Sequence, residues 1–172
     1  MKTKIIVAIG GMLVLASCKP TEAIDLRNTI SANDEYLKDI ILSERSPEEA
    51  KLNCLVNDDF KGALSAIDKQ EAQFDSLIQR TSAISVRNVK EGEALKRAAV
   101  DYYQALKLLH MADREEVMQQ VITHGVDTTK IRLAQDKILE LLERKGKLFQ
   151  QVYDKDEKMR KALDHFNKEN GL

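Results

Sequence analysis

The residues of this chain that are best suited to metal chemistry are its three histidines, His110, His124 and His165. In helical bundles that hold two iron ions, a glutamate stands three residues before a histidine on each of two helices, so that the ligands meet at one level. No glutamate stands at that position here: the residues found there are Lys107, Val121 and Ala162. The spacing therefore predicts no di-iron site, and we expect no metal-binding residues.

The cysteines and histidines also argue against haem. A covalently attached haem needs a Cys-x-x-Cys-His motif, and the two cysteines, Cys18 and Cys54, are too far apart to form one. A haem held without a covalent bond needs axial ligands such as histidine and methionine. His165 with Met118 or Met159 is the combination that the sequence offers, but a histidine at a surface or helix end is far more common. We expect no cofactor.

No residues are arranged as a nucleophile with its base. A serine or cysteine nucleophile is activated by an adjacent base that a third group orients, and such groups commonly lie on loops. The loops expected here are short, and His124 precedes Gly125 at a helix end, where a cation is stabilised by the helix dipole. The sequence has no glycine-rich loop for phosphate. We therefore expect no catalytic residues and a protein that is not an enzyme.

The N-terminal residues are organised as an export signal. Lys2 and Lys4 precede an apolar run over residues 5–16, as the charged and hydrophobic regions of a signal peptide do. A run of about twelve residues is too short for a stable membrane-spanning helix. We predict that residues 1–17 are a signal peptide and that the mature chain begins at Cys18.

The segment Leu15-Ala16-Ser17-Cys18 resembles the lipobox of bacterial lipoproteins. The resemblance implies that Cys18 is acylated on its sulfur and its amine by fatty acids such as palmitate, and two or more acyl chains anchor a protein stably. An ordinary secretory signal is the alternative. Lys19 is not the aspartate that often retains lipoproteins at the inner membrane, so the resemblance implies an outer-membrane protein of the cell envelope, facing either the periplasm or the surface.

The composition of the mature chain indicates one helical domain. Removing residues 1–17 leaves 155 residues with 25 basic and 28 acidic side chains, which predicts no nucleic-acid partner. Only 7 glycines and 2 prolines occur in the whole chain, and 32% of its residues are charged, which favours helices. We expect a lipidated tether over 18–22 and a bundle domain over 23–172. Cys54, between Leu52 and Leu55, is expected to be a small buried residue.

Apolar residues recur at helical spacing in four segments. The first helix is predicted over 21–44, with Asn33 at a core position. Ser46 and Pro47 begin a second helix, which the stripe extends to Ile84. The third is predicted over 91–123 with Tyr102 on the core stripe and Tyr103 on its flank. Asp127 caps the fourth, whose stripe runs to about Phe166 and is interrupted only by Lys145 and Lys155, whose amines are expected to reach water.

Four long helices with short connections predict an all-α fold, an elongated antiparallel up-down four-helix bundle. Because the stripes have a period near 3.5 residues, we expect coiled-coil-like packing. The first helix is shorter than the others, so one end of the bundle should hold three helices, unless the second helix bends to cover the gap. That end is where we expect an exposed apolar patch.

The stretch from Leu95 to Leu106, with its adjacent tyrosines, resembles the third helix of a family of uncharacterised helical lipoproteins of Gram-negative bacteria. The family has no assigned activity, so it implies no functional residues. We predict a lipid-anchored envelope protein that acts as a non-enzymatic binding or structural module, with membrane lipid and an unidentified envelope protein as partners. The alternative is a periplasmic bundle that binds a small ligand or a metal in a cavity lined by Asn33 and Gln70; a closed apolar core would favour the first reading.

Overall fold

The computed structural model describes residues 21–172, which form helices and no strand. The helices are α1 (Thr21–Leu42), α2 (Pro47–Val56), α3 (Phe60–Ser82), α4 (Gly92–Thr123) and α5 (Thr128–Asn170). The predicted signal peptide and Cys18 lie outside the described residues. Of the predicted tether, Thr21 and Glu22 are described, and they form the first turn of α1. The all-α class is confirmed.

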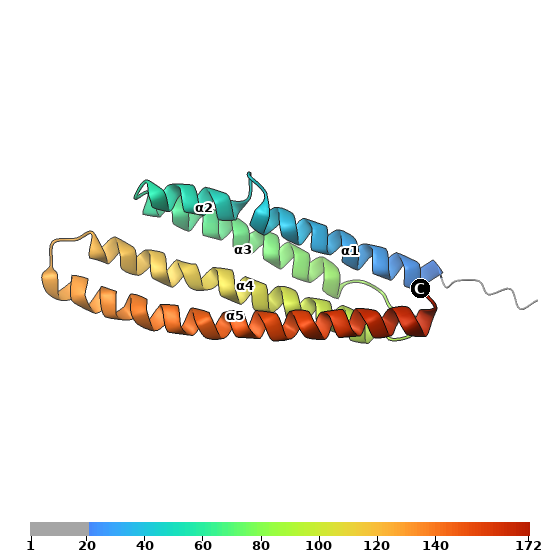
Figure 1. Ribbon diagram of the computed structural model, residues 1–172. Coiled ribbons are helices and arrows are strands. Elements are labelled where there is room, and N and C mark those ends of the chain that lie inside the picture. Colours follow the sequence, from blue (N-terminus) through green and yellow to red (C-terminus); the bar gives the residue numbers. More distant parts are fainter. Residues whose placement is uncertain (1–20) are drawn as a thin grey trace, which may run out of the picture.

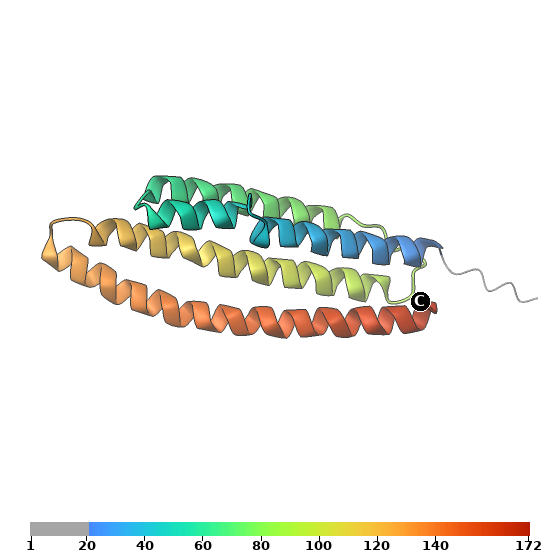
Figure 2. The same ribbon diagram turned by 45° about the horizontal axis from the view of Figure 1, so that its top comes forward.

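The helices pack into an elongated body that is four helices across, because α1 and α2 lie end to end (Figure 1). α3 contacts both α1 and α2. α4 packs against α3 on one side and against α5 on the other. Figure 2 shows α3 running beside the line formed by α1 and α2. α2 thus occupies the space beyond the end of α1. It fills the gap that we expected at one end of the bundle because the first helix is short.

The prediction of one continuous second helix from Pro47 to Ile84 is wrong, because the chain turns between Val56 and Phe60. Asp58 has a left-handed backbone with φ 55°, a conformation that aspartate and asparagine tolerate better than most residues. The Asp59 side chain then caps α3 by accepting a hydrogen bond of 2.8 Å from the Gly62 amide. The apolar spacing runs through this turn by coincidence, since Val56, which has the spacing of a core residue, is exposed.

Two helix starts predicted from the sequence are confirmed. The Ser46 hydroxyl accepts a hydrogen bond of 3.0 Å from the Glu49 amide, with Pro47 as the first residue of α2. The Asp127 carboxylate accepts hydrogen bonds from the amides of Thr129 and Lys130, at 3.0 and 3.1 Å. Both are local signals, since a capping side chain satisfies amides only two or three residues away.

The main core is apolar and joins residues of α1, α3, α4 and α5. Its large buried members are Leu26, Ile30, Leu37, Ile40, Phe74, Leu77, Leu95, Tyr103, Leu106, Met159 and Phe166. The two tyrosines of α4 are exchanged relative to the prediction, since Tyr103 is fully buried and Tyr102 half-buried. Tyr103 can lie in the core because its hydroxyl donates a hydrogen bond of 2.6 Å to Asp34 Oδ1.

Among residues 21–172, none of the helices combines the length and apolar character that crossing a membrane requires.

Candidate functional site

A network of buried charges joins α2, α4 and α5. Lys51 of α2 is almost completely buried, and its ammonium contacts both Asp113 of α4 and Glu48, the latter at 2.7 Å. Lys145 of α5 contacts the other oxygen of Asp113 and lies 3.6 Å from Glu116. The Asp113 carboxylate accepts hydrogen bonds from a lysine of α2 and a lysine of α5. It therefore links α2 to α5, two helices that otherwise have few contacts with each other.

The second half of the network surrounds the Glu48 carboxylate. Glu48 Oε2 lies 3.0 Å from His110 Nδ1 and accepts a hydrogen bond of 2.9 Å from Gln70 Nε2. The His110 ring packs against Phe74, with 5.6 Å between ring centroids. Burial alone would raise the pKa of Glu48, but the hydrogen bonds from His110, Lys51 and Gln70 outweigh burial and lower it to about 2. Glu48 is therefore ionised at neutral pH.

Three of these side chains form a set that could hold a metal ion. Glu48, His110 and Asp113 each offer one ligand atom, and the three atoms lie within 4.8 Å of one another. However, the Lys51 ammonium contacts both carboxylates of this set. A metal would have to displace a buried lysine that already neutralises its ligands, so the geometry favours an ion-pair network and we continue to expect no metal.

This network has no direct sign in the sequence, because its members are far apart along the chain. Glu48 and His110 are separated by 62 positions, so a search for Glu-x-x-His could not find them. The available signal was Lys145, which interrupts the stripe of α5. Both lysine side chains stay partly exposed, and the prediction missed that their amines pair with acids of α4: Lys145 with Asp113, and Lys155 with Asp101 at 2.6 Å.

The other histidines lie elsewhere. His124 follows α4, where its Nδ1 is 2.9 Å from the Gln120 carbonyl oxygen and its ring packs on Phe60. His165, near the end of α5, lies 3.7 Å from Glu91. The structure thus brings His110 alone into the network.

The remaining residues singled out in the sequence also have structural roles. Asn33 donates a hydrogen bond of 2.9 Å to the Thr81 hydroxyl, and both residues are buried. Cys54 is half-buried against the small apolar cluster of Ala63, Ile67 and Val117. Burial and the nearby Asp59 carboxylate raise the pKa of its thiol, which disfavours the reactive thiolate.

The low pKa of Glu48 predicts that acid weakens the attachment of α2. Its pKa falls from 4.5 to about 2 on folding, so Glu48 contributes stability above pH 4.5, on the order of 3 kcal/mol, which is lost as the pH falls from about 5 towards 2. Urea unfolding at pH 7 and pH 3 measures this loss. Glu48→Gln should be less stable at pH 7 and lose less on acidification than the wild type.

Glu49→Gln is the matched control, because Glu49 is an exposed glutamate on the same helix. We expect this variant to follow the wild type at both pH values. An acid loss in Glu48→Gln as large as that of the wild type would show that Glu48 does not link stability to pH.

Comparisons of the chain with protein-family models, with curated proteins and with solved structures found no significant match. The resemblance to helical lipoproteins stays a prediction.

Proposed function

We propose that this chain is a lipid-anchored protein of the cell envelope that acts as a non-enzymatic binding or structural module. The lipobox-like segment ending at Cys18 supports the anchor and the envelope location. The packed apolar core and the ion network support a non-enzymatic role, because the charges of the network neutralise one another and leave no activated nucleophile or base among its residues.

The observation that carries the binding role is an apolar stripe on the outer surface of α5. The stripe consists of Leu139, Leu142, Phe149 and Tyr153, with Gly146 at its middle. The four large side chains are between 49% and 62% exposed, and their spacing of three and four residues places them on one side of the helix. Together they form an apolar patch on the order of a few hundred Å², which is comparable with patches that mark interaction sites.

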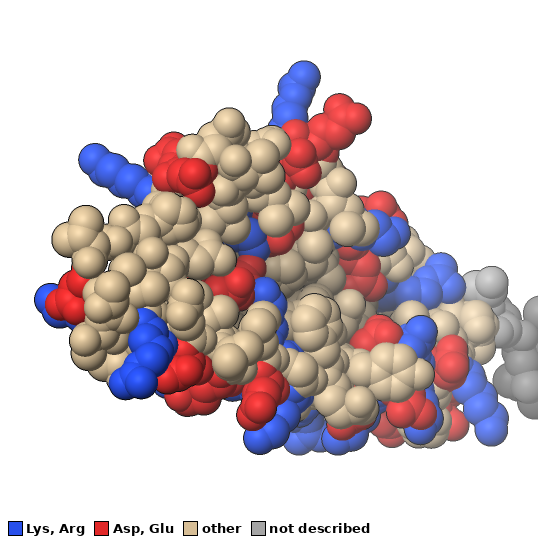
Figure 3. Space-filling model, turned by 60° about the vertical axis from the view of Figure 1, so that its left-hand side comes forward, with Lys and Arg blue, Asp and Glu red and all other residues tan. Residues whose placement is uncertain are grey.

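A helix of an envelope protein is the partner that fits this stripe. Apolar residues at three- and four-residue spacing are how helices recognise one another, and a side chain added at Gly146 would meet nothing within 4 Å, so a partner backbone can approach closely there. The end of the rod at the α4–α5 connection adds exposed apolar residues, Val121, Ile122, Val126 and Leu133. Figure 3 shows uncharged surface gathered at this end.

Photo-crosslinking in living cells tests this role. A photoreactive amino acid at Phe149 is expected to form a discrete adduct with an envelope protein. The matched control is Lys147, which is exposed on the same helix but points away from the stripe. Adducts of equal yield at the two positions, or none at Phe149, would contradict the binding role. An adduct of twice the chain mass would identify a second copy as the partner.

We also infer that the bundle is antiparallel and up-down, with coiled-coil-like packing. The inference is supported by the hydrogen bond of 2.9 Å from Asn170 Nδ2 to the Lys90 carbonyl oxygen, since it joins the end of α5 to the residues just before α4. The short connection between Thr123 and Thr128 agrees with it, because short connections join antiparallel neighbours.

The alternative of a ligand cavity inside the bundle gains no support from its two expected lining residues. Asn33 bonds to Thr81, and Gln70 bonds to Glu48 on a different level of the bundle. The Gln70 amide oxygen is buried without a partner among the described residues, but a single amide beside paired charges is better explained by one bound water than by a ligand.

A further inference from the structure

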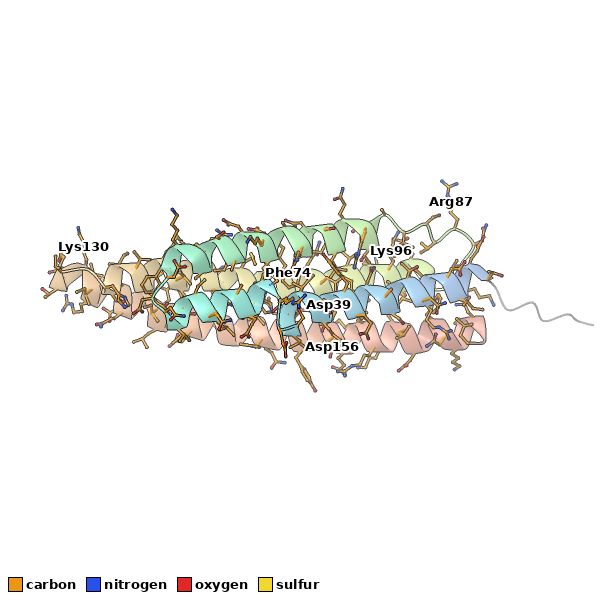
Figure 4. The ribbon with its side chains drawn as sticks, turned by 90° about the horizontal axis from the view of Figure 1, so that it is seen from above. Asp39, Phe74, Arg87, Lys96, Lys130 and Asp156 are labelled. Carbon is orange, nitrogen blue, oxygen red and sulfur yellow. The ribbon has the colours of Figure 1, made fainter. Side chains whose placement is uncertain are left out.

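A pocket of about 360 Å³ lies between α1, α4 and α5, on the other half of the rod from the ion network. Its apolar lining comes from Leu37 of α1, Tyr102 of α4, and Met159 and Leu163 of α5. Figure 4 shows Asp156, which also lines the pocket, on α5 beside α1. The volume is within the range of sites for small organic molecules.

The charges around the pocket are unequally matched. Glu35 pairs with Lys38 at 2.7 Å, and Asp156 pairs with Arg160 at 2.8 Å. Asp34, which also lines the pocket, is half-buried and accepts a hydrogen bond of 2.6 Å from the Tyr103 hydroxyl. No lysine, arginine or histidine within residues 21–172 forms an ion pair with it. Asp34 is thus the acid lining this pocket that forms no ion pair among the described residues, although the charge of Lys38 acts on it from a greater distance.

The pKa values of Asp34 and Tyr102 show that the ionised form of Asp34 is destabilised in this pocket. Burial raises the pKa of Asp34, although the hydrogen bond from Tyr103 and the charge of Lys38 act against it. Burial, together with the charges of Asp156 and Asp34, also raises the pKa of the Tyr102 hydroxyl. Both effects have the sign expected for a partly desolvated pocket with a negative potential. A cation bound beside Asp34 would stabilise its ionised carboxylate.

We propose that this pocket binds a small organic cation whose ammonium group pairs with the Asp34 carboxylate and whose apolar part packs on Tyr102, Met159 and Leu163. The pairing is a charge-assisted hydrogen bond in a partly buried site, which is stronger than one in open water. Tyr102 also lines the pocket, and an aromatic ring attracts a cation that lies over its face. The site is separate from the α5 stripe, so it goes beyond the proposed function.

Calorimetric titration of the full chain in detergent micelles tests the site, with empty micelles as the blank. The probes are benzylamine and benzyl alcohol, which share a ring and differ in charge at neutral pH. We expect the wild type to bind the amine about tenfold more tightly than the alcohol. In Asp34→Asn this preference should disappear, because the amide keeps the acceptor for the Tyr103 hydroxyl and removes the charge.

Glu35→Gln is the matched control, since Glu35 lines the same pocket but is paired with Lys38, and it should keep the preference for the amine. Thermal unfolding of each variant checks that the fold is retained. If Asp34→Asn does not fold, the comparison of the two probes on the wild type still decides the matter. Equal affinity of the two probes for the wild type, no saturable binding of benzylamine, or a preference that survives in Asp34→Asn would overturn the proposal.

Discussion

Cys18→Ala is expected to move the protein from the membrane fraction to the soluble fraction. Acyl chains on Cys18 are the proposed anchor, and each buried methylene group contributes about 0.8 kcal/mol, so losing all of them removes the attachment. The bundle begins at Thr21 and makes its own core, so its helical content should not change. Cell fractionation followed by immunoblotting measures the first effect, and circular dichroism measures the second.

Cys54→Ala is the control for this experiment, because it removes the other cysteine from within the bundle. It should leave the protein on the membrane. A wild type that is already soluble would refute the lipoprotein assignment. A Cys18→Ala variant that stays on the membrane would show that another surface of the chain holds it there.

Phe74→Ala is expected to cost about 3 to 5 kcal/mol in the free energy of unfolding, as truncation of a buried phenylalanine does. Phe74 is 0% exposed and lies in the main core, where its ring also supports His110 of the ion network. Denaturation by guanidinium chloride gives the change. Phe149→Ala is the matched control, because Phe149 is 58% exposed, and its loss should be below about 1 kcal/mol.

Equal losses in the two variants would mean that α5 buries its outer stripe in solution. Since that burial requires a partner, the comparison should be repeated over a range of protein concentrations. A loss in Phe149→Ala that grows with concentration would indicate self-association through the stripe.

The features that could be predicted from the sequence are those that depend on neighbouring residues. The all-α class follows from the spacing of apolar residues, and the starts of α2 and α5 follow from Ser46 and Asp127, which bond to amides within three positions. The turn at Asp58 was missed because the apolar spacing continues across it. Its polar residues, Asn57 to Asp59, were the local sign of a break.

The features that could not be predicted depend on pairs that are distant in the sequence. Tyr103, and not Tyr102, lies in the core. Its hydroxyl can be buried there because it donates a hydrogen bond to Asp34, which is 69 positions away in the sequence. Glu48 of α2 meets His110 and Asp113 of α4 only after the bundle has brought the two helices together. The periodicity of apolar residues ranks positions by hydrophobicity alone. It therefore cannot show that a buried lysine such as Lys51 forms an ion pair with an acid of another helix.

α2 is a short helix whose place in the bundle depends on its contacts with the other helices. A helix of ten residues, bounded by turns on both sides, is too short to persist in water without tertiary contacts. Those contacts combine the apolar packing of Cys54 and Leu55 with the buried charges of Glu48 and Lys51. Acid therefore weakens the charged part of the contacts and leaves the main apolar core intact. We therefore expect α2 to open in acid before α3, α4 and α5 unfold, in a sub-global fluctuation that exposes Asp113 to solvent. The ion network thus holds α2 on the bundle, and its strength decides how often α2 opens.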